Sequence, residues 1–151
     1  MDAQRLTDIL EEIKSVAKAV LLYGMETTGI CDLTETASEN LGIDWHDNAN
    51  ETLIEEEMER LEDNARDAVI EITDAIDSIL PLSSLNDVQI RKLDSEIFYL
   101  GHYGMYALNN VAEFTKRIIA SFALHDDTNG VDNLKYAIED ALEAEDEDED
   151  E

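Results

Sequence analysis

The sequence predicts an all-α protein: a helical bundle with two long, heptad-patterned antiparallel helices and short flanking helices. Apolar residues recur at spacings of three and four along most of the chain, and no segment alternates apolar and polar residues as a strand would. With 151 residues, 44% of them hydrophobic, the chain is long enough for one domain with a core. We expect one acidic helical domain over residues 1–142 and a disordered acidic C-terminal tail over 143–151.

The first periodic segment predicts an amphipathic helix that ends near Gly24. Residues 24–48 hold three glycines and many Thr, Ser and Asn residues, which indicates a loop with one short helix around 33–40. Trp45 is expected to anchor this loop to the core. The apolar positions of the first helix are Leu6, Ile9, Leu10, Ile13, Val16, Ala17, Val20 and Leu21.

A long helix is predicted from Glu51 to the residues before Pro81, which stops it. Its apolar residues alternate in steps of four and three for more than three heptads. Ser84, with Asp87 three residues later, has the spacing of a capping box and predicts the start of an antiparallel partner helix. The heptad positions of the long helix are Ile54, Met58, Leu61, Ala65, Ala68, Ile72, Ala75 and Ile79.

The partner helix is expected to run to about Leu124, with a bend at Gly101 or Gly104. Its apolar positions are Ile90, Leu93, Ile97, Leu100, Ala107, Val111, Phe114 and Ile118. The segment HDDTNGVDN predicts a turn, after which Asp132 would cap a last helix with Leu134, Ala137, Ile138, Ala141 and Leu142 on its apolar face. The final EAEDEDEDE has nothing to bury and predicts a solvated tail.

A net charge of −28 and a pI near 4.1 exclude nucleic acids and anionic membranes as direct ligands and favour basic proteins as partners. Outside the tail, 30 acidic residues still face 10 basic ones, so the domain itself is acidic. One cysteine, Cys31, allows no internal disulfide and is typical of a reducing compartment. The acidic N-terminus lacks the pattern of a signal peptide, and the longest apolar run is far too short to span a membrane, so a cytoplasmic location is expected.

No catalytic, metal or cofactor site is predicted. Neither His46, His102 nor His125 follows a glutamate at Glu-x-x-His spacing, and HExxH, P-loop and GxGxxG motifs are absent. Around Gly130, a resemblance to a calcium loop fails because His125 and Tyr136 occupy its first and twelfth ligand positions. The aromatic segment FYLGHYGMY, residues 98–106, predicts a packed helix crossing; if a small ligand binds, His102 is its expected polar contact.

The main functional signal is the acidic surface of the long helix, where residues 51–77 contain 11 Asp or Glu against two Arg. Glu55, Glu59 and Asp63 are like-charge neighbours four residues apart, each pair costing roughly 0.2–0.5 kcal/mol, and pairs of Glu56 with Arg60 and of Glu62 with Arg66 would offset only part of this. The expected partner-binding residues, hereafter the acidic face, are Glu55, Glu56, Glu59, Glu62, Asp63, Asp67, Glu71, Asp74 and Asp77.

The density of carboxylates along this helix, about one per 3.5 Å at about 1.5 Å of rise per residue, is close to the phosphate spacing of about 3.4 Å along one DNA strand. The runs IEEEMERLED and EAEDEDEDE in a small helical domain resemble phage-encoded antirestriction proteins of the Ocr kind, which mimic DNA. The resemblance implies an inhibitor of a host DNA-binding defence enzyme, acting as a dimer. The leading hypothesis is a decoy for a cationic DNA-binding site, self-associating through its heptad positions.

Two alternatives remain open. A chaperone, antitoxin or other binding module could mask a basic protein surface that does not bind DNA, with Ile70 or the exposed part of residues 98–106 as apolar contacts. A halophilic protein of unrelated function would also carry an acidic surface with few lysines. Thermal unfolding with and without molar salt distinguishes the halophile, which should lose its fold in dilute buffer.

Overall fold

The computed structural model describes residues 3–101 and 108–144, and within these ranges the regular structure is entirely helical. The long helices are α1 (Ala3–Thr27) and α3 (Glu51–Asp77), with α2 (Leu33–Leu41) and the short 3₁₀ turn η1 (Asn48–Asn50) between them. A second 3₁₀ turn, η2 (Leu82–Ser84), precedes α4 (Asp87–Gly101), α5 (Leu108–His125) and α6 (Asn129–Glu143).

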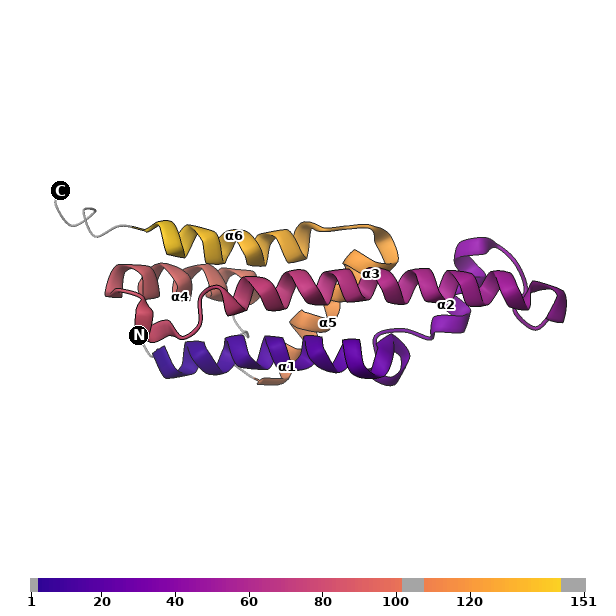
Figure 1. The fold of residues 1–151 in the computed structure, drawn as a ribbon, viewed down its shortest axis with the longest axis horizontal. Helices are drawn as coiled ribbons and strands as arrows, with labels where there is room; N and C mark the ends of the chain where they lie inside the picture. Colours follow the sequence, from indigo (N-terminus) through magenta and orange to yellow (C-terminus); the bar gives the residue numbers. More distant parts are fainter. Residues whose placement is uncertain (1–2, 102–107, 145–151) are drawn as a thin grey trace.

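The molecule is elongated, and α3 runs along its long axis with α1 on one side and α6 on the other (Figure 1). α5 crosses behind and packs on both α1 and α3, while α2 covers only the end of α3 that projects beyond the other long helices. α3 is therefore the element that positions surface residues along most of the molecule.

The antiparallel register of α1 and α3 is defined by two contacts. The Lys14 ammonium lies 2.5 Å from the Asp77 carboxylate, and the Met25 amide donates to the Glu62 carboxylate at 3.2 Å. Between these contacts the two helices bury Ala17 and Val20 of α1 against the α3 core. This register places residue 70 of α3 opposite residues 17–21 of α1.

Most of the predicted apolar positions of α1 and α3 form the core, whereas Val16 is half-buried and lies outside it. In α1, Leu6, Ile9, Leu10 and Ile13 are almost completely inaccessible, while Leu21 is exposed. In α3 and the turn after it, the apolar positions Ile54, Leu61, Ala65, Ala68, Ile72 and Ile79 are buried, and Met58 and Ala75 are partly buried. Because the chain's own helices cover these residues, a homodimer would have to use another surface.

The helix predicted after Pro81 begins later than expected. Ser84 does not cap it; instead the Asn86 side chain accepts from the Gln89 amide at 2.8 Å and the Gln89 side chain accepts from the Asn86 amide at 3.0 Å. Residues 82–84 instead form a 3₁₀ turn in which Leu82 is buried, and the reciprocal Asn86–Gln89 capping box starts the helix after this turn.

The predicted partner helix over 84–124 is also not one straight helix. α4 and α5 run in different directions (Figure 1), and α4 packs mainly on α6, not on α3. Gly101 ends α4, whereas Gly104, the other predicted bend, lies outside the described residues.

Two smaller expectations are wrong. Trp45 is 42% exposed and stacks on His46, with ring centroids 3.9 Å apart, because the Asp44 and Asp47 side chains and Asn50 hold this loop by polar contacts instead. The last helix begins at Asn129, not at Asp132. Asp132 lies in its first turn, where its carboxylate accepts from the Thr128 hydroxyl at 2.9 Å. At the other end Glu143 still belongs to α6, and residues 145–151 of the predicted tail lie outside the described residues.

Candidate functional site: the acidic face of α3

The acidic face lies on the side of α3 that the other helices leave uncovered. α3 buries Ile54, Leu61, Ala68 and Ile72 against its neighbours, and the residues between these positions point outward. Seven of the nine predicted carboxylates are exposed, and two are half-buried. The exposed ones are Glu55, Glu56, Glu59, Asp63, Asp67, Asp74 and Asp77; the half-buried ones are Glu62 and Glu71.

Three members of the acidic face are paired with cations. Asp63 accepts from Arg66 at 3.0 Å, Glu71 lies 3.1 Å from the Lys135 ammonium of α6, and Asp77 binds Lys14 of α1. The hydrogen bond to Asp77 raises the pKa of Lys14, and that to Glu71 raises the pKa of Lys135. These contacts fasten α1 and α6 to α3, so Glu71 and Asp77 contribute to the bundle as well as to the surface.

Glu62 has a structural partner. The backbone of α1 leaves helical geometry at Gly24, with φ at 89° and ψ at 164°, a combination that is essentially confined to glycine. The amide of the next residue, Met25, donates to the Glu62 carboxylate, and a Cβ on Gly24 would lie 2.9 Å from that carboxylate oxygen. Glu62 therefore stabilises the end of α1 and is the least available member of the acidic face.

Removing the Glu62 carboxylate is expected to destabilise the fold, whereas removing that of Asp67 is not. Glu62→Ala leaves the amide of the buried Met25 without its acceptor, which should lower the free energy of unfolding by about 1 kcal/mol. Asp67→Ala should change it by less than about 0.5 kcal/mol, as is usual for an exposed surface position. Urea denaturation of both variants checks this, and equal effects would contradict the assigned role of Glu62.

The remaining five carboxylates of the acidic face, Glu55, Glu56, Glu59, Asp67 and Asp74, have no ion pair within residues 3–101 and 108–144. The predicted pairs on α3 are wrong: Arg60 binds Glu57 instead of Glu56, and Arg66 binds Asp63 instead of Glu62. Both arginines thus reach back three residues rather than four. The local cations neutralise Glu57 and Asp63, and this leaves the outward row uncompensated.

Glu57 is the residue that the sequence analysis missed. It is only 9% exposed, and Arg60 holds it with two hydrogen bonds, of 2.9 and 2.6 Å, while the Asn40 amide of α2 donates at 3.1 Å. Chiefly because of Arg60, the pKa of Glu57 is lowered. Its position next to the apolar Met58 and three residues before an arginine was the available signal. Glu57 joins α2 to α3 and is not available to a partner.

The Glu57 contacts predict a specific loss of stability in acid. Because its pKa is lowered in the folded state, the stabilisation is fully present above about pH 4.3, near the pKa of an unfolded glutamate, and is lost as the pH falls through the folded value. Glu57→Gln should therefore be less stable than the unmodified protein at pH 7, and the gap should narrow towards pH 3. Urea denaturation across this range measures it. Asp74→Asn, at an exposed carboxylate without an ion pair among the described residues, is the control: its free energy of unfolding should differ from that of the unmodified protein by the same small amount at pH 7 and at pH 3.

Other polar groups do not assemble into a second site in the described part of the chain. His46 contacts only the neighbouring Asp44, at 2.9 Å, and Trp45; His125 is exposed at the end of α5; and His102 lies outside the described residues. Burial raises the pKa of the Cys31 thiol, which disfavours a reactive thiolate. Among the described residues no group of three or more His, Cys, Asp or Glu is arranged to hold a metal ion.

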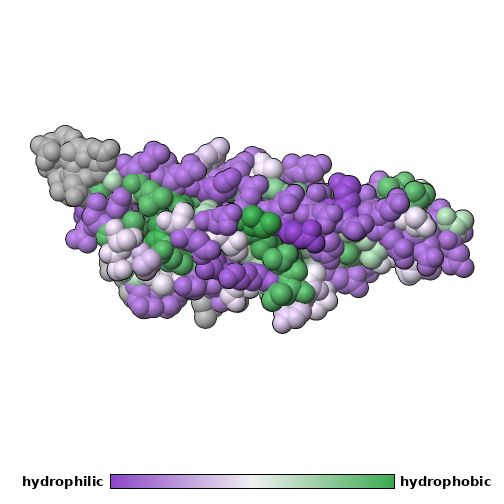
Figure 2. All heavy atoms as spheres, in the orientation of Figure 1, coloured by the Kyte–Doolittle hydropathy of each residue, from purple (hydrophilic) through white to green (hydrophobic). Residues whose placement is uncertain are grey.

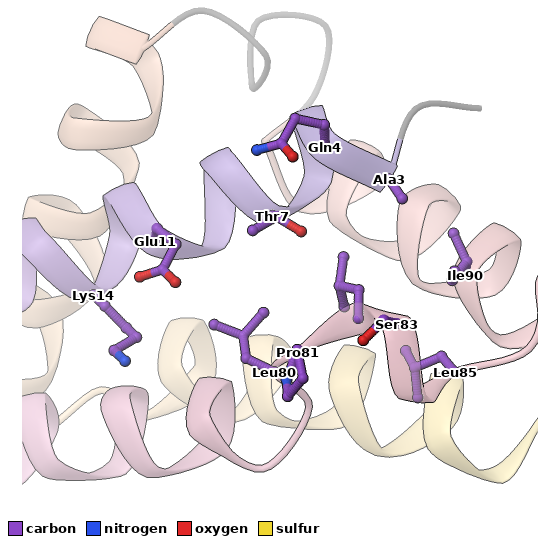
Figure 3. A pocket seen from close by; sticks show the side chains of 11 residues that line it. Ala3, Gln4, Thr7, Glu11, Lys14, Leu80, Pro81, Ser83, Leu85 and Ile90 are labelled. Carbon is purple, nitrogen blue, oxygen red and sulfur yellow. The ribbon is translucent and has the colours of Figure 1, made fainter.

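An open cavity of about 580 Å³ lies between the start of α1 and the segment that links α3 to α4 (Figure 3). Leu80, Pro81 and Leu85 form its apolar side, and Thr7 and Glu11 lie on the α1 side. Lys14, which also borders it, is already bound to Asp77. None of residues 98–100, the part of the aromatic segment whose side chains the structure describes, lines this cavity.

None of the described helices has an apolar stretch long enough to cross a membrane. Comparison with protein-family models, curated proteins and solved structures finds no match to this chain.

Proposed function

We propose that this protein is a DNA-mimic inhibitor that occupies the cationic DNA-binding site of another protein. The observation that carries the proposal is the row of five exposed carboxylates along the uncovered side of α3 that have no ion pair in the described part of the chain. A helix of 27 residues is about 40 Å long at 1.5 Å per residue. The row itself runs from Glu55 to Asp74 and covers about 29 Å of this length, comparable to about eight phosphates of one DNA strand.

The physical basis is the same one that favours DNA binding itself. A DNA-binding groove lined by Lys and Arg attracts anions, and duplex binding gains free energy when condensed counterions are released. A rigid anionic helix presents fixed charges to the same groove, and the net charge of −28 steers it towards a cationic surface. Inhibition then requires no contact with bases and no chemistry. A host defence enzyme is one target of this kind.

Affinity capture tests the proposal. The immobilised protein is exposed to a bacterial lysate at low and at high salt, and retained proteins are eluted with duplex DNA. We expect the eluted proteins to be nucleases, methyltransferases or transcription factors whose retention falls steeply with salt. Purified candidates should then lose bound duplex when the inhibitor is added near physiological ionic strength. Retention of basic proteins that duplex DNA does not displace would overturn the proposal.

The alternative of a chaperone, antitoxin or other module masking a basic surface is favoured by one feature: Ile70, within the acidic row, is 45% exposed. An apolar side chain among carboxylates fits a mixed protein interface better than a phosphate-like surface. Indifference of the captured partner to duplex DNA is the outcome that would select this alternative.

A further inference from the structure

A band of hydrophobic surface interrupts the hydrophilic face of the molecule near the middle of its long axis, where α3 and α1 run side by side (Figures 1 and 2). Large apolar residues exposed at this level include Leu21 and Leu22 at the end of α1, 45% and 74% exposed, and Ile70 of α3. The antiparallel register set by Lys14 with Asp77 and Met25 with Glu62 brings Ile70 opposite residues 17–21. We call Leu21, Leu22 and Ile70 the apolar patch.

The apolar patch extends from α3 across the seam onto α1, where Leu22 lines a hollow together with Lys18 and Tyr23. Leu21 borders a small hollow of about 160 Å³ together with Gly24, Glu62 and Arg66. An exposed apolar surface to which two antiparallel helices contribute suits a third helix that packs its own apolar side chains against it.

The charges around the patch are mostly negative. On α3, Ile70 has Asp63, Asp67, Asp74 and Asp77 at helical spacings of −7, −3, +4 and +7, all of them exposed. The nearby cations are Lys14 and Arg66, which are bound to Asp77 and Asp63, and Lys18 of α1. Asp67 and Asp74 are therefore the carboxylates near Ile70 that have no ion pair among the described residues, against Lys18 as the corresponding cation.

We propose that the apolar patch is a docking site for a cationic amphipathic helix of a partner protein, one whose leucine-like residues face Ile70 and Leu22 and whose flanking Lys or Arg residues face Asp67 and Asp74. Charge decides the occupant. A second copy of this chain would bring its own aspartates against these, and both copies carry a net charge of −28. The inference goes beyond inhibition by DNA mimicry, since it does not require that the partner bind DNA.

The test uses defined peptides with the full-length protein. One peptide of about 18 residues carries Leu at helical spacings i, i+3, i+4 and i+7 on a Lys background; the second has the same charges with Gln in place of each Leu. Fluorescence anisotropy at about 0.15 M salt should show at least about tenfold tighter binding of the leucine peptide. Equal binding of the two peptides would mean that charge alone acts, and would overturn the proposal.

The location is tested with variants. Leu22→Gln combined with Ile70→Gln should reduce the tenfold preference to less than about threefold, with unchanged helicity because both side chains are exposed. The matched control, Leu53→Gln with Leu142→Gln, alters two exposed leucines away from the patch and should keep the preference. A preference that survives the patch variant, or is lost in the control, would place the docking site elsewhere.

A second copy as occupant is tested by sedimentation of the protein alone. We expect no self-association through the patch, so the unmodified protein and the Leu22→Gln, Ile70→Gln variant should sediment alike at physiological and at high salt. A dimer that the Leu22→Gln, Ile70→Gln variant abolishes would overturn the proposal in favour of self-association. If the protein failed to displace duplex DNA from a captured target, that result would contradict only the DNA-mimic function, because neither peptide binding nor sedimentation involves DNA.

Discussion

Replacement of Glu56, Glu59 and Asp67 together by lysine is expected to weaken binding to a DNA-displaceable target by about 100-fold or more at low salt. All three are exposed carboxylates of the acidic face without an ion pair in the described structure, so their reversal changes attraction into repulsion without breaking an internal contact. The dissociation constant of a captured target, measured at several salt concentrations, checks this. The variant should also show a shallower dependence of log affinity on log salt, since fewer ions are released.

A charge-matched control separates the acidic face from net charge. The combination Glu39→Lys, Glu139→Lys and Asp140→Lys changes the net charge by the same six units but alters exposed residues of α2 and α6. It should retain most of the affinity. If both triple variants weaken binding equally, the target senses only the overall field of the protein, and the proposed site on α3 is wrong.

The sequence was sufficient to predict the helices whose stability depends on local periodicity. The burial of Leu61, Ala65 and Ile72 follows from spacing alone, and so does the outward direction of the carboxylates between them. The separation of α4 from α5 could not be predicted this way, because α4 is oriented by packing on α6, which is distant in sequence. Periodicity shows which side of a helix is apolar but not which neighbour covers it.

The same limit applies to the acidic face. Nine carboxylates could be assigned to it by exclusion from the core, but their availability depends on partners far along the chain. Glu62 meets an amide 37 residues away, and Asp77 and Glu71 meet lysines 63 and 64 residues away. These contacts remove Glu62 and partly remove Glu71 and Asp77 from the surface available to a partner. Most of the carboxylates that remain available to a partner lie in the first two thirds of α3, where fewer helices cover the acidic face.

The close approach of α6 to α5 predicts that a single added methyl group destabilises the fold. A Cβ placed on Gly130 would lie 2.6 Å from Cγ2 and 2.9 Å from Cβ of Ile118, a buried, β-branched residue that cannot move aside without its backbone. Gly130→Ala gains helix propensity, worth up to about 1 kcal/mol, but the overpacking costs about 1–3 kcal/mol. We expect the overlap to dominate, with a net loss of about 1–2 kcal/mol.

A double-mutant cycle in urea identifies the cause of this loss. Ile118→Ala alone opens a cavity and should cost about 2–4 kcal/mol, but it removes the Cγ2 atom that the new methyl group would meet. Gly130→Ala should therefore cost less in the Ile118→Ala background than in the unmodified protein, whereas independent effects would add. Asn133→Ala, at an exposed position of the same helix, provides the control for helix propensity and should not destabilise. Strict additivity in the cycle would show that the two helices do not meet at this glycine.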